Sequence, residues 1–85
     1  MAASITFTLR NNQMTDVNVT VVDLRTNTKA IDNVPLNVDE RVPVNIVAGS
    51  DDRGSALWVF ASSDGSVNSN KKQDGIRDGD ECTLG

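Results

Sequence analysis

The sequence predicts an all-β fold: a compact two-sheet antiparallel β-sandwich of about six strands, with a partly open β-barrel as the alternative. Three observations carry this prediction. Apolar residues recur at every second position, β-branched valines occupy many of these positions, and the apolar residues do not repeat with a helical period. Residues 1–85 form a single predicted domain, because the chain has the length of one domain and contains no long linker.

The N-terminal part of the chain predicts a β-hairpin. Apolar and polar residues alternate strictly over residues 4–9, and the alternation resumes over residues 17–21 after a polar turn. The apolar set then changes face at Val22-Asp23-Leu24, which indicates a β-bulge or a crossing between sheets.

The middle of the chain predicts two strands at sheet edges. Residues 29–38 contain Pro35, and residues 42–46 contain Pro43. Proline has no N–H to donate to a β-ladder, so each of these strands is expected to have an open side.

Residues 56–61 (ALWVFA) are the most apolar stretch, and both faces of this predicted strand are hydrophobic. Such a strand is either central and covered on both faces, or one of its faces is an interface. Trp58, in mid-strand among apolar neighbours, is expected first as a core anchor. The alternative is an interface made by Ala56, Trp58 and Phe60, because aromatic residues also concentrate at interface centres.

The last quarter of the chain predicts little regular structure. Residues 62–80 are mostly Ser, Asn, Asp, Gly and Lys and are expected to form a long polar loop. A short closing strand is expected over residues 81–84.

The composition argues against an enzyme. The chain has no His and no Tyr, so the commonest general acid–base groups are missing, and triads built on His cannot form. Carboxylates remain, but a catalytic pair must flank a substrate cleft that so small a chain can hardly enclose.

The charge, the hydropathy and the single cysteine indicate which partners and which compartment to expect. A net charge of −4 and only three aromatic residues argue against nucleic-acid binding. No apolar run is long enough to span a membrane, so no membrane association is expected. One cysteine cannot form an internal disulfide, which favours a reducing compartment such as the cytoplasm.

Residues 70–81 (NKKQDGIRDGDE) resemble part of a calcium-binding loop. Asp74, Asp78 and Glu81 fall at ligand positions of an EF-hand loop, but Lys72 falls where an oxygen ligand is required. The alternative is a solvated loop with turns at its glycines.

A second acidic cluster, Asp51-Asp52, would join this loop if both lie at one end of the sandwich. The candidate metal site therefore comprises Asp51, Asp52, Asp74, Asp78 and Glu81, and calcium is the one cofactor that the sequence suggests.

The predicted function is a non-enzymatic structural or interaction module. It would self-associate, or dock onto a protein partner, through the strand over residues 56–61 or through an open sheet edge. The alternative is a calcium-dependent domain that binds a ligand, carbohydrate in particular. No feature of the sequence identifies a small-molecule ligand.

Overall fold

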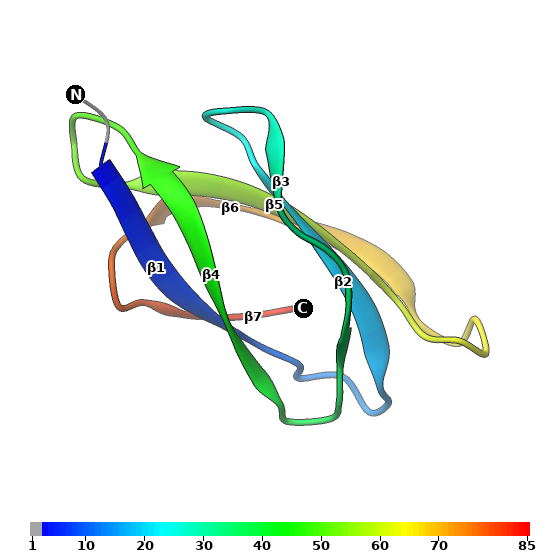
Figure 1. Ribbon diagram of the computed structural model, residues 1–85. Helices are drawn as coiled ribbons and strands as arrows, with labels where there is room; N and C mark the ends of the chain where they lie inside the picture. The colour runs from blue at the N-terminus through cyan, green and yellow to red at the C-terminus, as the bar shows by residue number, and fades with distance from the viewer. Residues whose placement is uncertain (1–2) are drawn as a thin grey trace.

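The computed structural model describes residues 3–85, which fold into seven strands without a helix. The strands are β1 (Ala3–Arg10), β2 (Val17–Asp23), β3 (Thr28–Leu36), β4 (Arg41–Ala48), β5 (Gly54–Ala61), β6 (Asn68–Ile76) and β7 (Glu81–Thr83). They form two layers (Figure 1), a sheet in the order β4-β1-β7 and a sheet in the order β3-β2-β5-β6. The predicted two-sheet β-sandwich is confirmed, and the sheets do not close into a barrel. Residues 3–85 include no helix that could cross a membrane.

The three-stranded sheet combines antiparallel and parallel pairing. β1 pairs with β4 in antiparallel register along its whole length, from Ala3 opposite Ala48 to Arg10 opposite Arg41. β7 pairs with the end of β1 in parallel register, with Thr83 opposite Arg10. The parallel pair departs from the expected antiparallel arrangement, because the chain reaches β7 from the edge of the other sheet and not through a hairpin. The predicted hairpin of residues 4–9 and 17–21 is wrong: β1 and β2 lie in different sheets, so the turn between them crosses from one layer to the other.

Both proline-containing strands lie at sheet edges, as expected. β4, with Pro43, is one of the two outer strands of the three-stranded sheet, and β3, with Pro35, is an outer strand of the four-stranded sheet. Each proline therefore lies in a strand that pairs on one side only, where a missing N–H can be tolerated.

The core lies between the inward faces of the two sheets. Phe7 on β1 and Trp58 on β5 meet there, with ring centroids 6.0 Å apart. The other buried apolar residues include Leu9, Val19, Val21, Leu36, Val44, Ile76 and Leu84. The aromatic pair thus joins the two layers at their centre.

The expected loop over residues 62–80 contains a strand. β6 pairs with β5 from Ala61 opposite Asn68 to Gly54 opposite Ile76. It forms the second edge of the four-stranded sheet, and only its last residue, Ile76, is buried. A strand exposed on both faces has no apolar alternation, so the pattern that revealed the other strands is absent from it.

Three buried polar residues lie where the inward-facing side chains of β1, β2 and β5 come to an end. Asn11 follows β1, Asp23 ends β2 and Ser62 follows β5, and each is at most 8% exposed. Asn11 and Asp23 each accept a hydrogen bond from the backbone N–H two residues later, at 2.8 and 3.0 Å. Each of these side chains therefore closes a turn where its strand stops.

Asp23 also joins the two sheets. Its second carboxylate oxygen accepts a hydrogen bond from Val47 N on β4 at 2.8 Å. This contact explains the change of pattern at Val22-Asp23-Leu24: Val22 points outward, and Asp23 takes the inward position as a hydrogen-bonded carboxylate. The ladder between β2 and β3 has register shifts on both sides of Val21, so an irregularity does occur in this strand.

The loop between β5 and β6 supports a prediction about pH. The carboxylate of Asp64 accepts hydrogen bonds from the hydroxyl of Ser62 at 2.6 Å and from Ser66 N and Oγ at 3.0 and 2.7 Å. These bonds, with Ser62 first, lower the pKa of Asp64 from 3.8 to about 2. Because the folded-state pKa is depressed, the stabilisation is present above pH 3.8 and is lost as the pH falls towards 2.

We therefore expect the Asp64 carboxyl to titrate near pH 2 when it is followed by carbon-detected NMR. In Ser62→Ala the midpoint should move towards 3.8, since the largest cause of the shift is removed. Ser63→Ala is the matched control, because Ser63 is exposed and does not donate to Asp64. An unchanged midpoint in Ser62→Ala would contradict this account of the loop.

Candidate functional site

The outward face of the four-stranded sheet carries an apolar centre, formed by Val22, Leu57 and Val59 and called here the outer patch. Leu57 lies opposite Val22 on one side and Lys72 on the other, and Val59 lies opposite Thr20 and Asn70. Val59 is 44% exposed, although β5 is an inner strand of the sheet. The patch therefore occupies the middle of a sheet face that no other part of residues 3–85 covers.

The rim of the outer patch carries both signs of charge. Lys29 lies opposite Val22 on β3 and is 3.5 Å from Asp32. Lys72 on β6 is 3.8 Å from Asp74. Both ion pairs are well exposed, so each contributes about 1 kcal/mol or less to the fold, and the four groups remain free to contact a partner.

The residues that the sequence assigned to an interface lie on the opposite face of β5. Ala56 and Trp58 are fully buried, and Phe60 is 3% exposed. All three pack in the core of the single chain, on the side of β5 that faces the other sheet. This face is therefore not available to a partner. Only the face with Leu57 and Val59 is left for an interface on this strand.

The five carboxylates proposed as a metal site are divided among three places. Asp51, Asp52 and Asp78 line one hollow, Asp74 lines a second hollow, and Glu81 lies on β7. Within residues 3–85, no group of three or more acidic, Cys or His side chains has a geometry suited to a metal ion.

Most of these carboxylates have a partner within the chain. Asp78 Oδ1 accepts a hydrogen bond from Thr6 N at 2.9 Å. Glu81 Oε1 accepts one from Arg41 Nε at 2.6 Å, which lowers the pKa of Glu81 below its usual value. Asp74 and Asn70 lie on the extended strand β6, where the chain does not curl around a common centre as a calcium loop does.

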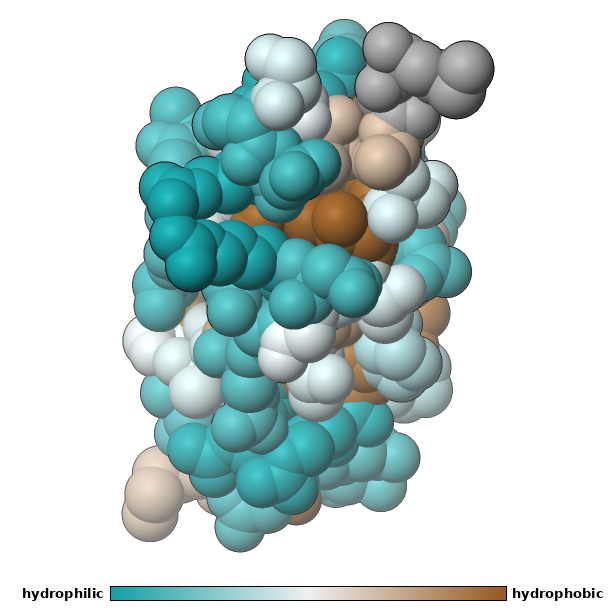
Figure 2. Space-filling model, turned by 90° about the vertical axis from the view of Figure 1, so that its left-hand side faces the viewer, coloured by the Kyte–Doolittle hydropathy of each residue, from teal (hydrophilic) through white to brown (hydrophobic). Residues whose placement is uncertain are grey.

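The hollow that holds Asp51, Asp52 and Asp78 has a volume of about 570 Å³ and also contains Arg53 and Arg77. It opens between the start of β1 and the loops that follow β4 and β6. Figure 2 shows this side of the molecule, where hydrophilic side chains surround a recess with apolar atoms at its floor. Ile5 is the apolar residue among those that line the hollow. Two guanidinium groups beside three carboxylates nearly neutralise the hollow, which weakens its attraction for a cation.

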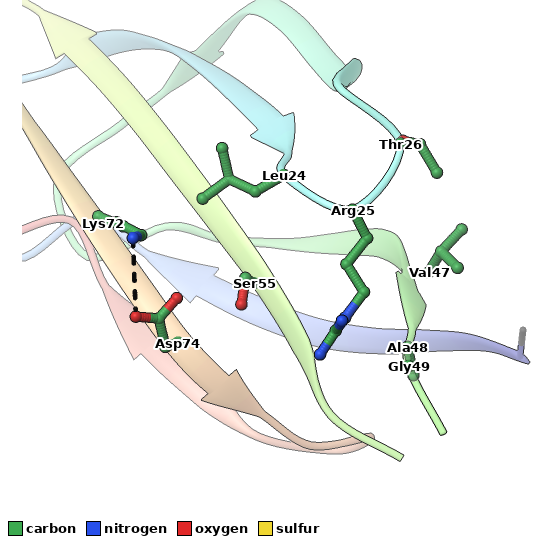
Figure 3. Close-up of a pocket in the computed structure, with 9 residues that line it drawn as sticks. All are labelled: Leu24, Arg25, Thr26, Val47, Ala48, Gly49, Ser55, Lys72 and Asp74. Carbon is green, nitrogen blue, oxygen red and sulfur yellow. Dashed lines mark ion pairs between the residues drawn. The ribbon is translucent and has the colours of Figure 1, made fainter. Parts of the chain in front are cut away.

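The second hollow has a volume of about 550 Å³, and Figure 3 shows the residues that line it. Leu24 and Arg25 line one part of it, and the Lys72–Asp74 ion pair lies across from them. Arg25 is engaged with the loop after β4: its Nε donates to Arg53 O at 3.1 Å, and its Nη2 is 3.6 Å from Asp51. This arginine holds the loop after β4 in place. Its guanidinium group is therefore already paired and is not free to bind a ligand in the hollow.

Two groups that organise the molecule were missed at the sequence level. Asn11 donates from Nδ2 to Thr15 O and Leu36 O, both at 3.0 Å. Leu84 is fully buried, and its carbonyl accepts a hydrogen bond from Trp58 Nε1 at 2.9 Å. The burial of Asn11 could have been predicted, because the inward-facing residues of β1 are odd-numbered and Asn11 is the next odd position. No pattern in the sequence indicates that the carbonyl of Leu84 accepts a hydrogen bond from Trp58.

Comparison with known proteins gives no assignment at this point. No protein-family model, curated protein or solved structure matches the chain. The proposals below therefore rest on the geometry of residues 3–85 alone.

Proposed function

We propose that the protein is a non-enzymatic interaction module that self-associates through the outer patch of its four-stranded sheet. The observation that carries this proposal is the exposure of Val59 on an inner strand, next to Leu57 and Val22. An aliphatic cluster at the centre of a sheet face gains free energy when a second surface removes it from water.

A second copy of the chain fits this face. Two copies related by a twofold axis bring the same patch into contact with itself, so the patch must be self-complementary. The rim meets this requirement because Lys29 and Lys72 each lie beside an aspartate, and a cation of one copy can face a carboxylate of the other.

The expected association is weak. Strands about 4.8 Å apart and eight residues long give a four-stranded face of about 500 Å². This is less than the roughly 800 Å² per partner of a standard interface. We therefore expect a dissociation constant in the micromolar range or weaker.

The test is light scattering coupled to size-exclusion chromatography, from about 10 µM to 1 mM protein. The wild-type mass should rise above the monomer value of 9.1 kDa with concentration. Val59→Lys should remain monomeric, because it places a charge at the centre of the patch. Met14→Lys is the matched control: Met14 is 97% exposed and lies in the turn after β1, away from the patch. A wild-type monomer at 1 mM would contradict the proposal.

A calcium-dependent binding domain is the second candidate, supported by the meeting of Asp51, Asp52 and Asp78 at one hollow. Arg53 and Arg77 in the same hollow, and the bond from Thr6 N to Asp78, weigh against it. Calcium at about one hundred times its dissociation constant would stabilise the fold by about 2.7 kcal/mol. We expect an unchanged Tm at millimolar calcium; a rise that Asp52→Asn abolishes would favour the second candidate.

A further inference from the structure

The last segment of the sequence lies along one edge of β1 as an added strand. Asp78 accepts a hydrogen bond from Thr6 N, and Gly79 N donates to Thr6 O at 2.8 Å. Thr8 N donates to Asp80 O at 2.8 Å, and β7 then continues in parallel register. Residues 78–85 therefore follow β1 from its middle to its end.

The segment ends on a buried anchor. The side chain of Leu84 is fully buried, Leu84 N donates to Arg10 O at 3.1 Å, and Leu84 O accepts the indole N–H of Trp58. Beyond it, Gly85 exchanges two hydrogen bonds with the side chain of Asn12, at 2.8 and 3.0 Å. The edge of β1 and the indole of Trp58 thus form a groove that is shaped for this segment.

A short exposed link joins the segment to the rest of the fold. Ile76 at the end of β6 is buried, whereas Arg77, Asp78 and Gly79 are exposed. Gly79 has a φ of +86°, and its surroundings would leave space for a side chain. A change of direction at Arg77 would release the segment without disturbing the pairing of β5 with β6.

We propose that residues 78–85 are exchanged between two copies of the chain, so that each copy fills the groove of the other. The hydrogen bonds and buried contacts that residues 78–85 make with β1, Asn12 and Trp58 are reproduced in such a dimer. Only Arg77 changes conformation, with loss of the two turn bonds between Arg77 and Asp80. The exchange also completes a β-sheet edge with a strand from a partner, which is a common mode of recognition.

The closed monomer competes strongly with the exchanged dimer. A short link holds the segment near its own groove at an effective concentration in the millimolar range. We therefore expect exchange at protein concentrations of about 0.1 to 1 mM and after warming close to Tm, where the segment opens. On cooling, the exchanged dimer should persist, because its return to the monomer requires the same opening.

The experiment uses a disulfide across the parallel pair. Arg10 and Thr83 are opposite each other in the register of β1 and β7, and the Cα separation of such neighbours, about 4.8 Å, suits a disulfide. The full chain with Arg10→Cys, Thr83→Cys and Cys82→Ser is warmed at about 10 µM and at about 1 mM, cooled, oxidised and run on a non-reducing denaturing gel. A closed monomer gives an internal bond, and an exchanged dimer gives a covalent dimer.

We expect the dimer band to increase at least tenfold between the two concentrations. Protein oxidised before warming should stay monomeric, because the segment is then fixed in its own groove. A monomer band alone at 1 mM would overturn the proposal. So would an equal dimer band in the variant that carries Thr83→Cys and Cys82→Ser without Arg10→Cys, since that band cannot arise from pairing of an exchanged segment with β1.

This inference extends the self-association proposed above but uses a different surface. Adding Val59→Lys to the cysteine pair removes the outer patch and should leave the covalent dimer unchanged. Loss of the covalent dimer in that background would mean that the segment does not exchange by itself. Failure of the outer patch alone would appear as a wild-type chain that is monomeric before warming and dimeric after it.

Discussion

Replacement of Trp58 by alanine should destabilise the protein by about 3 to 5 kcal/mol, the range for a buried Trp or Phe replaced by Ala. Trp58 is fully buried between the sheets and contacts Phe7. Its indole N–H is also the hydrogen-bond donor to the buried carbonyl of Leu84. A loss of this size is a large part of the total stability of a small domain, so the variant is expected to be largely unfolded.

Trp58→Phe separates packing from hydrogen bonding. It keeps an aromatic ring in the core but leaves the carbonyl of Leu84 without a donor, which should cost about 1 to 3 kcal/mol. The measurement is urea unfolding followed by far-ultraviolet circular dichroism, because the only Trp is lost. Val59→Ala, one residue along the strand and 44% exposed, is the matched control. A Trp58→Phe variant as stable as the wild type would show that the bond to Leu84 contributes nothing.

Asn11→Ala should be the second most damaging change, at about 3 kcal/mol. The side chain of Asn11 is fully buried and satisfies three backbone groups, namely Thr15 O, Leu36 O and Gln13 N. Alanine would leave these groups without partners, and each unpaired buried group costs about 1 to 3 kcal/mol unless water reaches it. The backbone of Asn11 also bonds to Glu40 O and Asp39 N, so the residue connects the turn after β1 with the turn between β3 and β4.

The Asn11 prediction can be checked by equilibrium unfolding in urea at neutral pH. Asn11→Asp is a useful companion, because it has nearly the same volume but replaces the two N–H donors by an oxygen that faces Leu36 O. We expect it to destabilise at least as much as alanine. Asn70→Ala serves as the control, since Asn70 is exposed on β6. Equal stability of Asn11→Ala and Asn70→Ala would contradict the role given to Asn11.

The alternation of apolar residues predicted most of the strands, but not which of them pair. β1, β2, β4 and β5 each bury one face, and burial of one face leaves a period of two in the sequence. β6 has two exposed faces, so it could not be found by that signal. Pairing direction was equally hidden: nothing local to residues 81–84 distinguishes a parallel partner from an antiparallel one.

The candidate sites were harder to predict than the strands. The pattern of β5 showed that both faces are apolar, but the choice between them depends on the position of the other sheet. That position turned the Trp58 face inward and left the Val59 face exposed. The acidic residues of the predicted metal site do not meet at one place: Asp74 is on a strand, Asp78 is in a turn, and they face different hollows. Long-range geometry of this kind is not encoded in a short motif.

The position of the last strand has a consequence for how the protein is made. Thr6 is bonded to Asp78, 72 residues away in sequence, and Leu84 covers Trp58 in the core. A ribosome must therefore release nearly the whole described chain before the edge of β1 can be closed, and until then that edge and the indole are exposed. Folding should be comparatively slow, since its decisive contacts are among the most distant in the described chain. During this interval the nascent protein is most exposed to misassembly, and chaperones that bind apolar strands would find their target in β1.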